Sequence, residues 1–146
     1  MNTRLGVSVL VFGWLGLLSV LALQDDQTKK DLAAMKGEWK VVKADRNGHA
    51  ASDELLQKMK VSITDDTITV DDGKRKDPAK FKLNPATQPK QIDILPEGNS
   101  NRTILGIYEI NKGVLRICYL RGEGDRPKEF VSKAESRLVL MELKRP

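Results

Sequence analysis

The sequence predicts an all-β fold of about eight antiparallel strands, connected in series as an up-and-down meander and closed into a barrel. First, apolar and polar residues alternate with a period of two from Lys60 onward, which is typical of strands with one face on a core. Second, turn residues such as Asn47-Gly48 and Asn111-Lys112-Gly113 interrupt the alternation at short intervals. Third, Cys118 is the only cysteine, so packing and not an internal disulfide must stabilise the domain. A two-sheet sandwich, the alternative architecture, has the same pattern.

Residues 1–22 have the pattern of a secretory signal peptide. Arg4 supplies a positive charge, residues 5–21 are almost wholly apolar, and Ala22 precedes a sharp return to polarity. We expect cleavage after Ala22, which leaves residues 23–146 as one exported domain, periplasmic or extracellular, with no stable membrane span. The alternative is an uncleaved anchor, because the apolar run approaches the length that spans a bilayer.

Two short helices are expected, one before and one after the first strand. Residues 27–36 begin with Thr28 as a possible cap and end at Gly37, a residue type that favours the left-handed conformation at helix ends. Residues 52–59 begin with Ser52, a good N-cap, and acidic residues follow it in the first turn. Each segment carries an apolar stripe, which more often packs on a core than binds a cofactor.

The strands are expected where β-branched and aromatic residues alternate with polar ones between turn signals. The expected runs are 39–41, 61–64, 67–70, 79–83, 92–94, 103–110, 114–120 and 138–144. Serial short connections between them favour a single domain without an internal repeat.

The charge distribution argues against nucleic-acid binding. The formal net charge of +5 is modest, and its charges are scattered along the chain. The only tight basic cluster, Lys74-Arg75-Lys76, lies beside acidic residues and has no aromatic neighbours on which bases would stack. These charges are therefore interpreted as a solvated turn.

No catalytic or metal-binding motif stands out, and no cofactor is expected. His49 is the only histidine and follows a turn, whereas a metal site needs several ligands together. Asp93, Glu109 and Glu142 lie in expected strands, and a pair of them pointing into a barrel would allow glycosidase-like chemistry. A hydrolase is the least favoured of the three functional hypotheses, since strand acids usually lie on the solvated face.

The favoured hypothesis is a binding domain for a small apolar ligand. Phe81, Tyr108 and Tyr119 are large aromatic residues that would line a pocket inside the barrel, with the tyrosine hydroxyls as polar anchors. The alternative is a solid core filled by these residues, in a module that contacts another envelope protein through the loops at 96–101 and 121–127.

Gly37-Glu38-Trp39, placed between a short helix and a strand meander, resembles the Gly-x-Trp signature of the lipocalin-like superfamily. The resemblance implies that Trp39 plugs the closed end of the barrel and that Arg145, or less favourably Lys144, packs over it. The chain from about residue 32 onward is also similar to a family of small exported lipocalin-like domains expanded in planctomycete bacteria. That likeness rests on these segments: Gly37–Val42, Asn47-Gly48, Leu105–Ile110, Leu115–Tyr119 and Arg126–Phe130. It implies a fold and export, and brings no catalytic residues.

Overall fold

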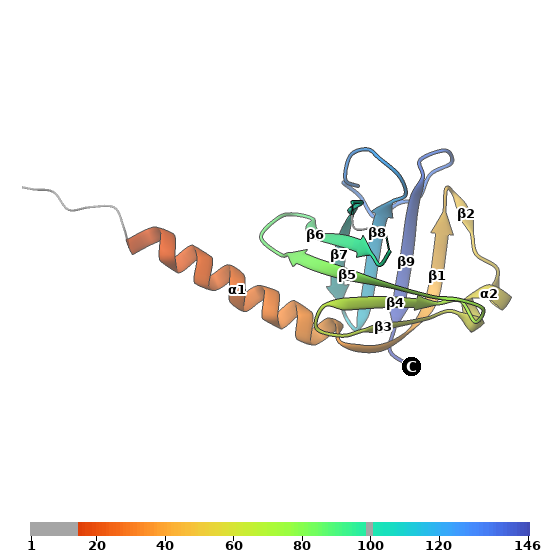
Figure 1. Ribbon diagram of the computed structural model, residues 1–146, viewed down its shortest axis with the longest axis horizontal. Helices are drawn as coiled ribbons and strands as arrows, with labels where there is room; N and C mark the ends of the chain where they lie inside the picture. Colours follow the sequence, from red (N-terminus) through yellow and green to blue (C-terminus); the bar gives the residue numbers. More distant parts are fainter. Residues whose placement is uncertain (1–14, 99–100) are drawn as a thin grey trace, which may run out of the picture.

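The computed structural model describes residues 15–98 and 101–146 as two helices and nine strands. In chain order these elements are α1 (Leu15–Met35), β1 (Gly37–Arg46), β2 (His49–Ala50), α2 (Asp53–Lys58), β3 (Lys60–Ile63), β4 (Thr67–Asp71), β5 (Lys76–Asn84), β6 (Lys90–Pro96), β7 (Ile104–Asn111), β8 (Val114–Leu120) and β9 (Leu138–Lys144). The long helix α1 extends from one side of a strand-rich body (Figure 1).

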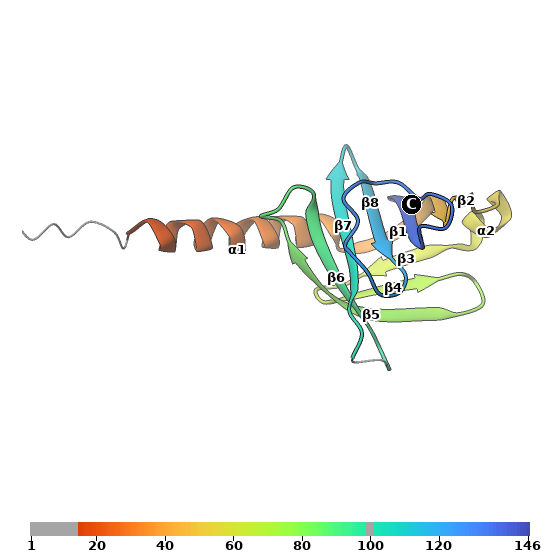
Figure 2. The ribbon, with the colours of Figure 1, turned by 90° about the horizontal axis from the view of Figure 1, so that it is seen from above.

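The strands form one antiparallel sheet in the order β2-β1-β3-β4-β5-β6-β7-β8-β9. An additional pairing of β1 with β9 closes this sheet into a barrel, to which the two-residue strand β2 is attached at the rim. Viewed from above, β4 and β5 lie on one side of the barrel and β8 on the other (Figure 2). The predicted all-β barrel is confirmed, and the sandwich alternative is wrong because the first and last strands are hydrogen-bonded to each other.

Closure depends on a bend in β1, which pairs with different neighbours along its length. Gly37–Lys40 pair with β3, whereas Lys40–Arg46 pair with β9, and a register shift lies between Val41 and Lys43. Such a bulge adds one residue to one strand and bends it. The far half of β1 therefore leaves β3, and α2 with its flanking residues occupies the gap between them.

One end of the barrel is closed by packed side chains. Trp39 and Met35 are almost fully buried there, and the Trp39 indole N–H donates a 2.7 Å hydrogen bond to the Met35 carbonyl. The guanidinium carbon of Arg145 lies 3.9 Å from the centre of the Trp39 ring, a cation–π geometry. Gly37 has φ +111°, and a Cβ built there would lie only 2.7 Å from Nη1 of Arg145. Glycine is therefore required both by the backbone conformation and by the close approach of Arg145.

A second, smaller apolar cluster lies on the outside of the barrel. Ile107, Cys118 and Leu140 point away from the main core and are covered by Phe130. The guanidinium carbon of Arg116 lies over the Phe130 ring, 4.8 Å from its centre. The segment after β8 thus packs against the outer face of β7, β8 and β9.

The helices differ in how closely they follow the sequence prediction. The helix expected over residues 52–59 is present as α2, and Ser52 accepts a hydrogen bond from the Leu55 backbone N–H. The helix expected over 27–36 instead begins at Leu15. Thr28 is not its cap, because the Thr28 hydroxyl donates to the Gln24 carbonyl inside the helix, and residues 17–27 contain no glycine or proline. Residues 1–14 of the predicted signal peptide lie outside the described residues.

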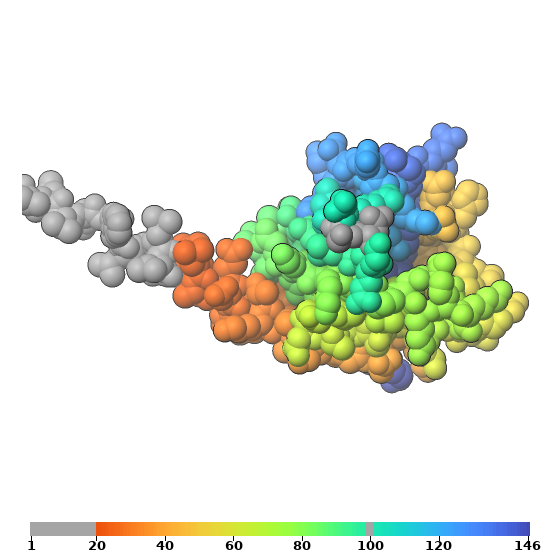
Figure 3. All heavy atoms as spheres, in the orientation of Figure 1, coloured from red at the N-terminus to blue at the C-terminus, as the bar shows by residue number. Residues whose placement is uncertain are grey.

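The exposed beginning of α1 is apolar. Val20, Leu21 and Leu23 are 60–70% exposed, and this part of the helix protrudes from the body of the molecule (Figure 3). Neither helix in the described part of the chain has an apolar stretch that would be sufficient to span a membrane.

Candidate functional site

The main candidate site is a cavity of about 650 Å³ at the end of the barrel opposite Trp39. Its inner wall is apolar and is formed by inward-facing residues of β4, β6, β8 and β9, namely Ile68, Val70, Ile94, Ile117, Val139 and Met141. A volume of this size is typical of small-molecule sites, which are mostly apolar with a few polar groups. Apart from the half-buried Val70, these residues are 0–8% exposed and belong to the packed core, so the cavity is an open recess whose floor is that core.

Helix α2 forms the side wall where β1 and β3 have separated. Leu55 and Met59 line the cavity from this segment, and Leu55 is 41% exposed although it is a large apolar residue. The Met59 carbonyl accepts a 3.5 Å hydrogen bond from the Val41 backbone N–H, and Ala51 donates a 2.7 Å bond to Ala44. These contacts tie the segment to the edge of β1 that β3 does not cover.

Charged residues surround the mouth of the cavity, and most of the acidic ones already have partners. Asp45 pairs with Lys43 at 3.4 Å, and Asp77 pairs with Arg75 at 2.9 Å. Asp72 accepts 2.8 Å hydrogen bonds from the backbone N–H groups of two residues in its own turn, and these bonds lower the pKa of its carboxyl. Glu97 is the remaining acid at the mouth.

Tyr119 on β8 brings a phenol to the lining of the cavity. Burial raises the pKa of Tyr119 above its ordinary value, although the nearby cations Arg121 and Arg46 act in the opposite direction. All three residues line the cavity. The lining thus combines an apolar wall with one phenol, three guanidinium groups and the four carboxylates of the mouth.

The three aromatic residues expected to line a pocket lie in two different places. Tyr119 lines the cavity, whereas Phe81 and Tyr108 belong to the packed core. Tyr108 is fully buried, and its hydroxyl reaches α1 instead of the cavity. Gly37 and Trp39 of the Gly-x-Trp pattern, together with Arg145, lie at the opposite, closed end of the barrel.

The strand carboxylates do not form a pair inside the barrel. Asp93, Glu109 and Glu142 alternate with inward-facing apolar neighbours, so all three lie on the outer face. Asp93 pairs with Arg126 at 2.6 Å, and Glu109 pairs with Arg116 across the β7–β8 ladder. The idea that two of them point into the barrel as a hydrolytic pair is wrong, because their side chains project from the outer face of the sheet.

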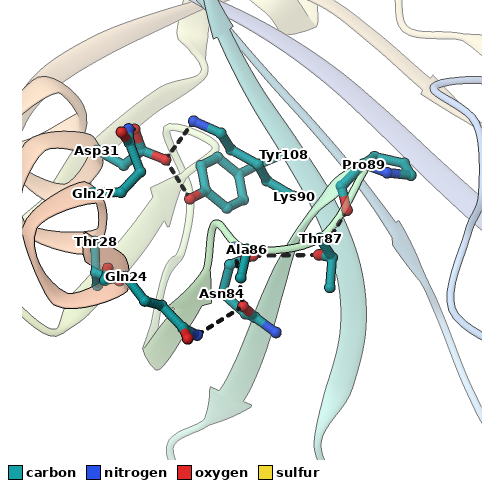
Figure 4. Close-up of polar contacts among 10 residues, drawn as sticks. All are labelled: Gln24, Gln27, Thr28, Asp31, Asn84, Ala86, Thr87, Pro89, Lys90 and Tyr108. Carbon is teal, nitrogen blue, oxygen red and sulfur yellow. Dashed lines mark hydrogen bonds and ion pairs between the residues drawn. The ribbon is translucent and has the colours of Figure 1, made fainter. Parts of the chain in front are cut away.

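A buried polar network joins α1 to the barrel (Figure 4). Asp31 is only 6% exposed, and its Oδ2 accepts hydrogen bonds from the Tyr108 hydroxyl at 2.6 Å and from Lys90 at 2.8 Å. Gln27 donates to the other oxygen at 2.8 Å. Burial raises the pKa of Asp31, but these hydrogen bonds outweigh it and hold the pKa below its ordinary value. The pKa of Tyr108 is raised by burial and by the Asp31 carboxylate.

This network was not anticipated from the sequence, although a signal for it exists. Asp31 lies four residues before Met35 and four after Gln27, so it shares the core-facing side of α1. A carboxylate on such a face indicates a buried partner. The network has all its polar groups satisfied and attaches the helix, so we assign it a structural role.

The other features singled out from the sequence lie outside the cavity wall or at its rim. His49 is exposed at the mouth, with Nδ1 3.1 Å from the Asn47 carbonyl, and the described residues contain no cluster of metal-ligating side chains. In the loop 121–127, Arg126 bonds to the Ile92 and Gly106 carbonyls and is occupied in holding the loop on the sheet. In the loop 96–101, residues 99–100 lie outside the described residues.

The chain was compared with protein-family models, with curated proteins and with solved structures. None of the three comparisons found a match.

Proposed function

We propose that this protein is an exported lipocalin-like domain that binds a small apolar ligand in the cavity at the open end of its barrel. The observation that carries the proposal is the cavity itself, a chamber of about 650 Å³ with an apolar inner wall. The packed closed end supplies the rigid support that a preformed site needs.

A ligand that covers the apolar wall removes apolar surface from water, which makes the binding free energy more favourable. Burial of apolar surface is worth about 25 cal/mol per Å², so a ligand covering the chamber recovers several kcal/mol. Half-exposed Leu55 on α2 adds to the surface that a ligand would cover. The open cavity with its apolar floor favours this function over a solid-core interaction module, whose contacts would all lie on the outer loops.

The test uses a neutral dye and two matched substitutions on one strand. Val70 lines the cavity, whereas the side chain of its neighbour Thr69 points to the outside of the barrel. Val70→Trp places a large side chain in the chamber, and Thr69→Trp adds the same side chain outside. The full chain and both variants are titrated with N-phenyl-1-naphthylamine, a neutral apolar dye, and its fluorescence enhancement is followed.

The wild type and Thr69→Trp should bind the dye with similar affinity, and Val70→Trp should bind it about tenfold more weakly, a change of about 1.4 kcal/mol. Circular dichroism of all three proteins establishes that the barrel is intact. Absence of dye binding to the folded wild type, or equal binding by both variants, contradicts the proposal.

Export is tested separately from binding. The expected product is a chain that begins at residue 23, recovered from the periplasm or the medium. Intact-mass measurement of the protein from each cell fraction decides this. A full-length chain confined to the cytoplasm contradicts export and leaves the ligand test unaffected.

A further inference from the structure

The loop after β8 contains two glycines that allow two arginine side chains to approach each other. Gly122 has φ +109° and Gly124 has φ +143°, conformations that favour glycine. A Cβ built on Gly122 would lie 3.0 Å from Nη1 of Arg137 and 3.7 Å from Nη2 of Arg102. Apart from Gly122 and the two residues beside it, the three heavy atoms nearest to that point all belong to these guanidinium groups. The absence of a side chain on Gly122 therefore gives room to two cations.

The backbone of Arg137 is held so that its guanidinium lies along this turn. Arg137 has φ +58°, a left-handed conformation that is uncommon for a residue with a side chain. Its N–H donates a 2.9 Å hydrogen bond to Oδ1 of Asn47, and its carbonyl accepts a 2.9 Å bond from the Arg121 N–H. A Cβ built on Gly124 would lie 3.7 Å from Nη2 of Arg137. Uncommon backbone conformations persist where the surroundings fix them, and they are frequent at ligand sites.

Neither guanidinium has a contacting counter-charge in the described part of the chain. No carboxylate there forms an ion pair with Arg102 or Arg137. The acids nearest in sequence to the turn and to Arg137 are all exposed, and none of them belongs to an ion pair between described residues: Glu123, Asp125 and Glu135. Two like charges at short range repel each other, so an anion bound between them would be stabilised by both.

The two guanidinium groups are close enough to hold a single anion. The distances of 3.0 and 3.7 Å to one point limit the separation of Nη1 of Arg137 and Nη2 of Arg102 to their sum, about 7 Å. A tetrahedral oxyanion spans such a gap, because its oxygens are about 2.5 Å apart and each accepts a charge-assisted hydrogen bond of about 2.8 Å. Guanidinium also suits phosphate, which it binds through two parallel hydrogen bonds.

We propose that Arg102, Arg137 and the turn from Gly122 to Gly124 bind a doubly charged tetrahedral oxyanion, the group shared by inorganic phosphate and phosphate monoesters. Two guanidinium groups match the two negative charges of this group. Both arginines are exposed, so the site admits either a free anion or a phosphate at the end of a larger molecule. None of these residues lines the barrel cavity, so the proposal does not depend on an apolar ligand.

The test measures anion binding to the full-length protein by isothermal titration calorimetry. Inorganic phosphate, phenyl phosphate and nitrate are titrated at one ionic strength, set with sodium chloride, and at about pH 8, where a phosphate monoester carries close to two negative charges. Phosphate should bind at least about tenfold more tightly than nitrate, a singly charged planar oxyanion, because only a dianion neutralises both guanidinium groups.

Matched double variants remove two positive charges from different places. Arg102→Gln with Arg137→Gln should weaken phosphate binding about tenfold or more, because the charge-assisted hydrogen bonds are lost. Lys40→Gln with Lys82→Gln lowers the net charge equally at exposed strand positions and should leave the affinity unchanged. Thermal denaturation without phosphate establishes that all three proteins are folded.

Each outcome decides one part of the proposal. Absence of phosphate binding to the folded wild type overturns it, and equal affinity for phosphate and nitrate overturns the doubly charged class. Equal weakening by both double variants overturns the assignment to Arg102 and Arg137. Phenyl phosphate distinguishes the source of the group: an affinity equal to or above that of the free anion supports a phosphate monoester, and a weaker one supports inorganic phosphate.

Discussion

The two ends of this barrel are built from the same strands but differ in how their inner space is filled. At the closed end, β1 pairs with β3, α1 lies close by, and Trp39, Met35 and Tyr108 are buried without exception. At the open end, β1 has turned away to β9, and the space that β3 leaves is bounded by a short helix with no buried residue. The difference teaches that the same strands enclose a fully packed end and, beyond Lys40 where the β1–β3 ladder stops, an end with an open cavity.

The largest expected effect is at the plug of the closed end. Trp39→Ala should lower the free energy of unfolding by about 3–5 kcal/mol, since it removes a fully buried aromatic side chain and its hydrogen bond to Met35. Tyr119→Ala at the open end should cost about half of this or less, because part of its surface already faces the cavity. Urea denaturation of both variants measures the two losses. Similar losses would contradict the division of the barrel into a packed end and an open end.

The next effect concerns the attachment of α1 through Asp31. Asp31→Ala should cost about 1–3 kcal/mol, because it leaves the buried Tyr108 hydroxyl and the half-buried Lys90 ammonium without their acceptor. The difference between wild type and variant is measured by denaturation at several pH values. Lys82→Ala, which removes an exposed side chain from β5, is the control and should change stability little.

The pH dependence of that difference has a definite sign. The pKa of Asp31 is lowered in the folded protein from its ordinary value of 3.8, so the unfolded chain takes up this proton first as the pH falls. The stabilisation by the carboxylate is therefore complete well above pH 3.8 and is lost as the pH drops through the folded pKa. Wild type and Asp31→Ala should become more alike in acid. A difference that stays constant down to pH 2.5 or so contradicts a stabilising role for the charged form.

The sequence was sufficient to predict the barrel because each strand is specified locally. Period-two alternation and turn residues identify the strands from 61–64 to 138–144, and a helix cap at Ser52 identifies α2. The ladder between β1 and β9 then follows from serial pairing, since the first and last strands are the only edges left to join.

The candidate site was not predictable in the same way, because it depends on contacts between distant residues. The ladder between β1 and β3 ends at Lys40, because β3 begins at Lys60, and this limit decides which residues face the cavity. Tyr108 and Tyr119 lie on the same side of the barrel wall and look equivalent in sequence, yet one meets Asp31 and the other meets the cavity. Arg46 and Arg121 line the same cavity only because β9 pairs with both β1 and β8.

The smallest expected effect on the free energy of unfolding comes from replacing one arginine at the packed end of the barrel and one at the open end. Arg145 stacks on Trp39 and donates hydrogen bonds to the Ala34 carbonyl at 2.8 Å and to the Glu38 carbonyl at 3.4 Å. Arg145→Met keeps much of the apolar stem but loses these interactions, and should cost about 0.5–2 kcal/mol.

Arg121→Met is the matched substitution at the open end, where the guanidinium has no ion-pair partner among the described residues. It should change the free energy of unfolding by less than about 0.5 kcal/mol, or raise it slightly as repulsion from Arg102 and Arg137 is relieved. Thermal denaturation of both variants in low salt is the measurement. If Arg121→Met costs as much as Arg145→Met, Arg121 is part of the structural framework, and the two ends do not differ in how their arginines contribute to stability.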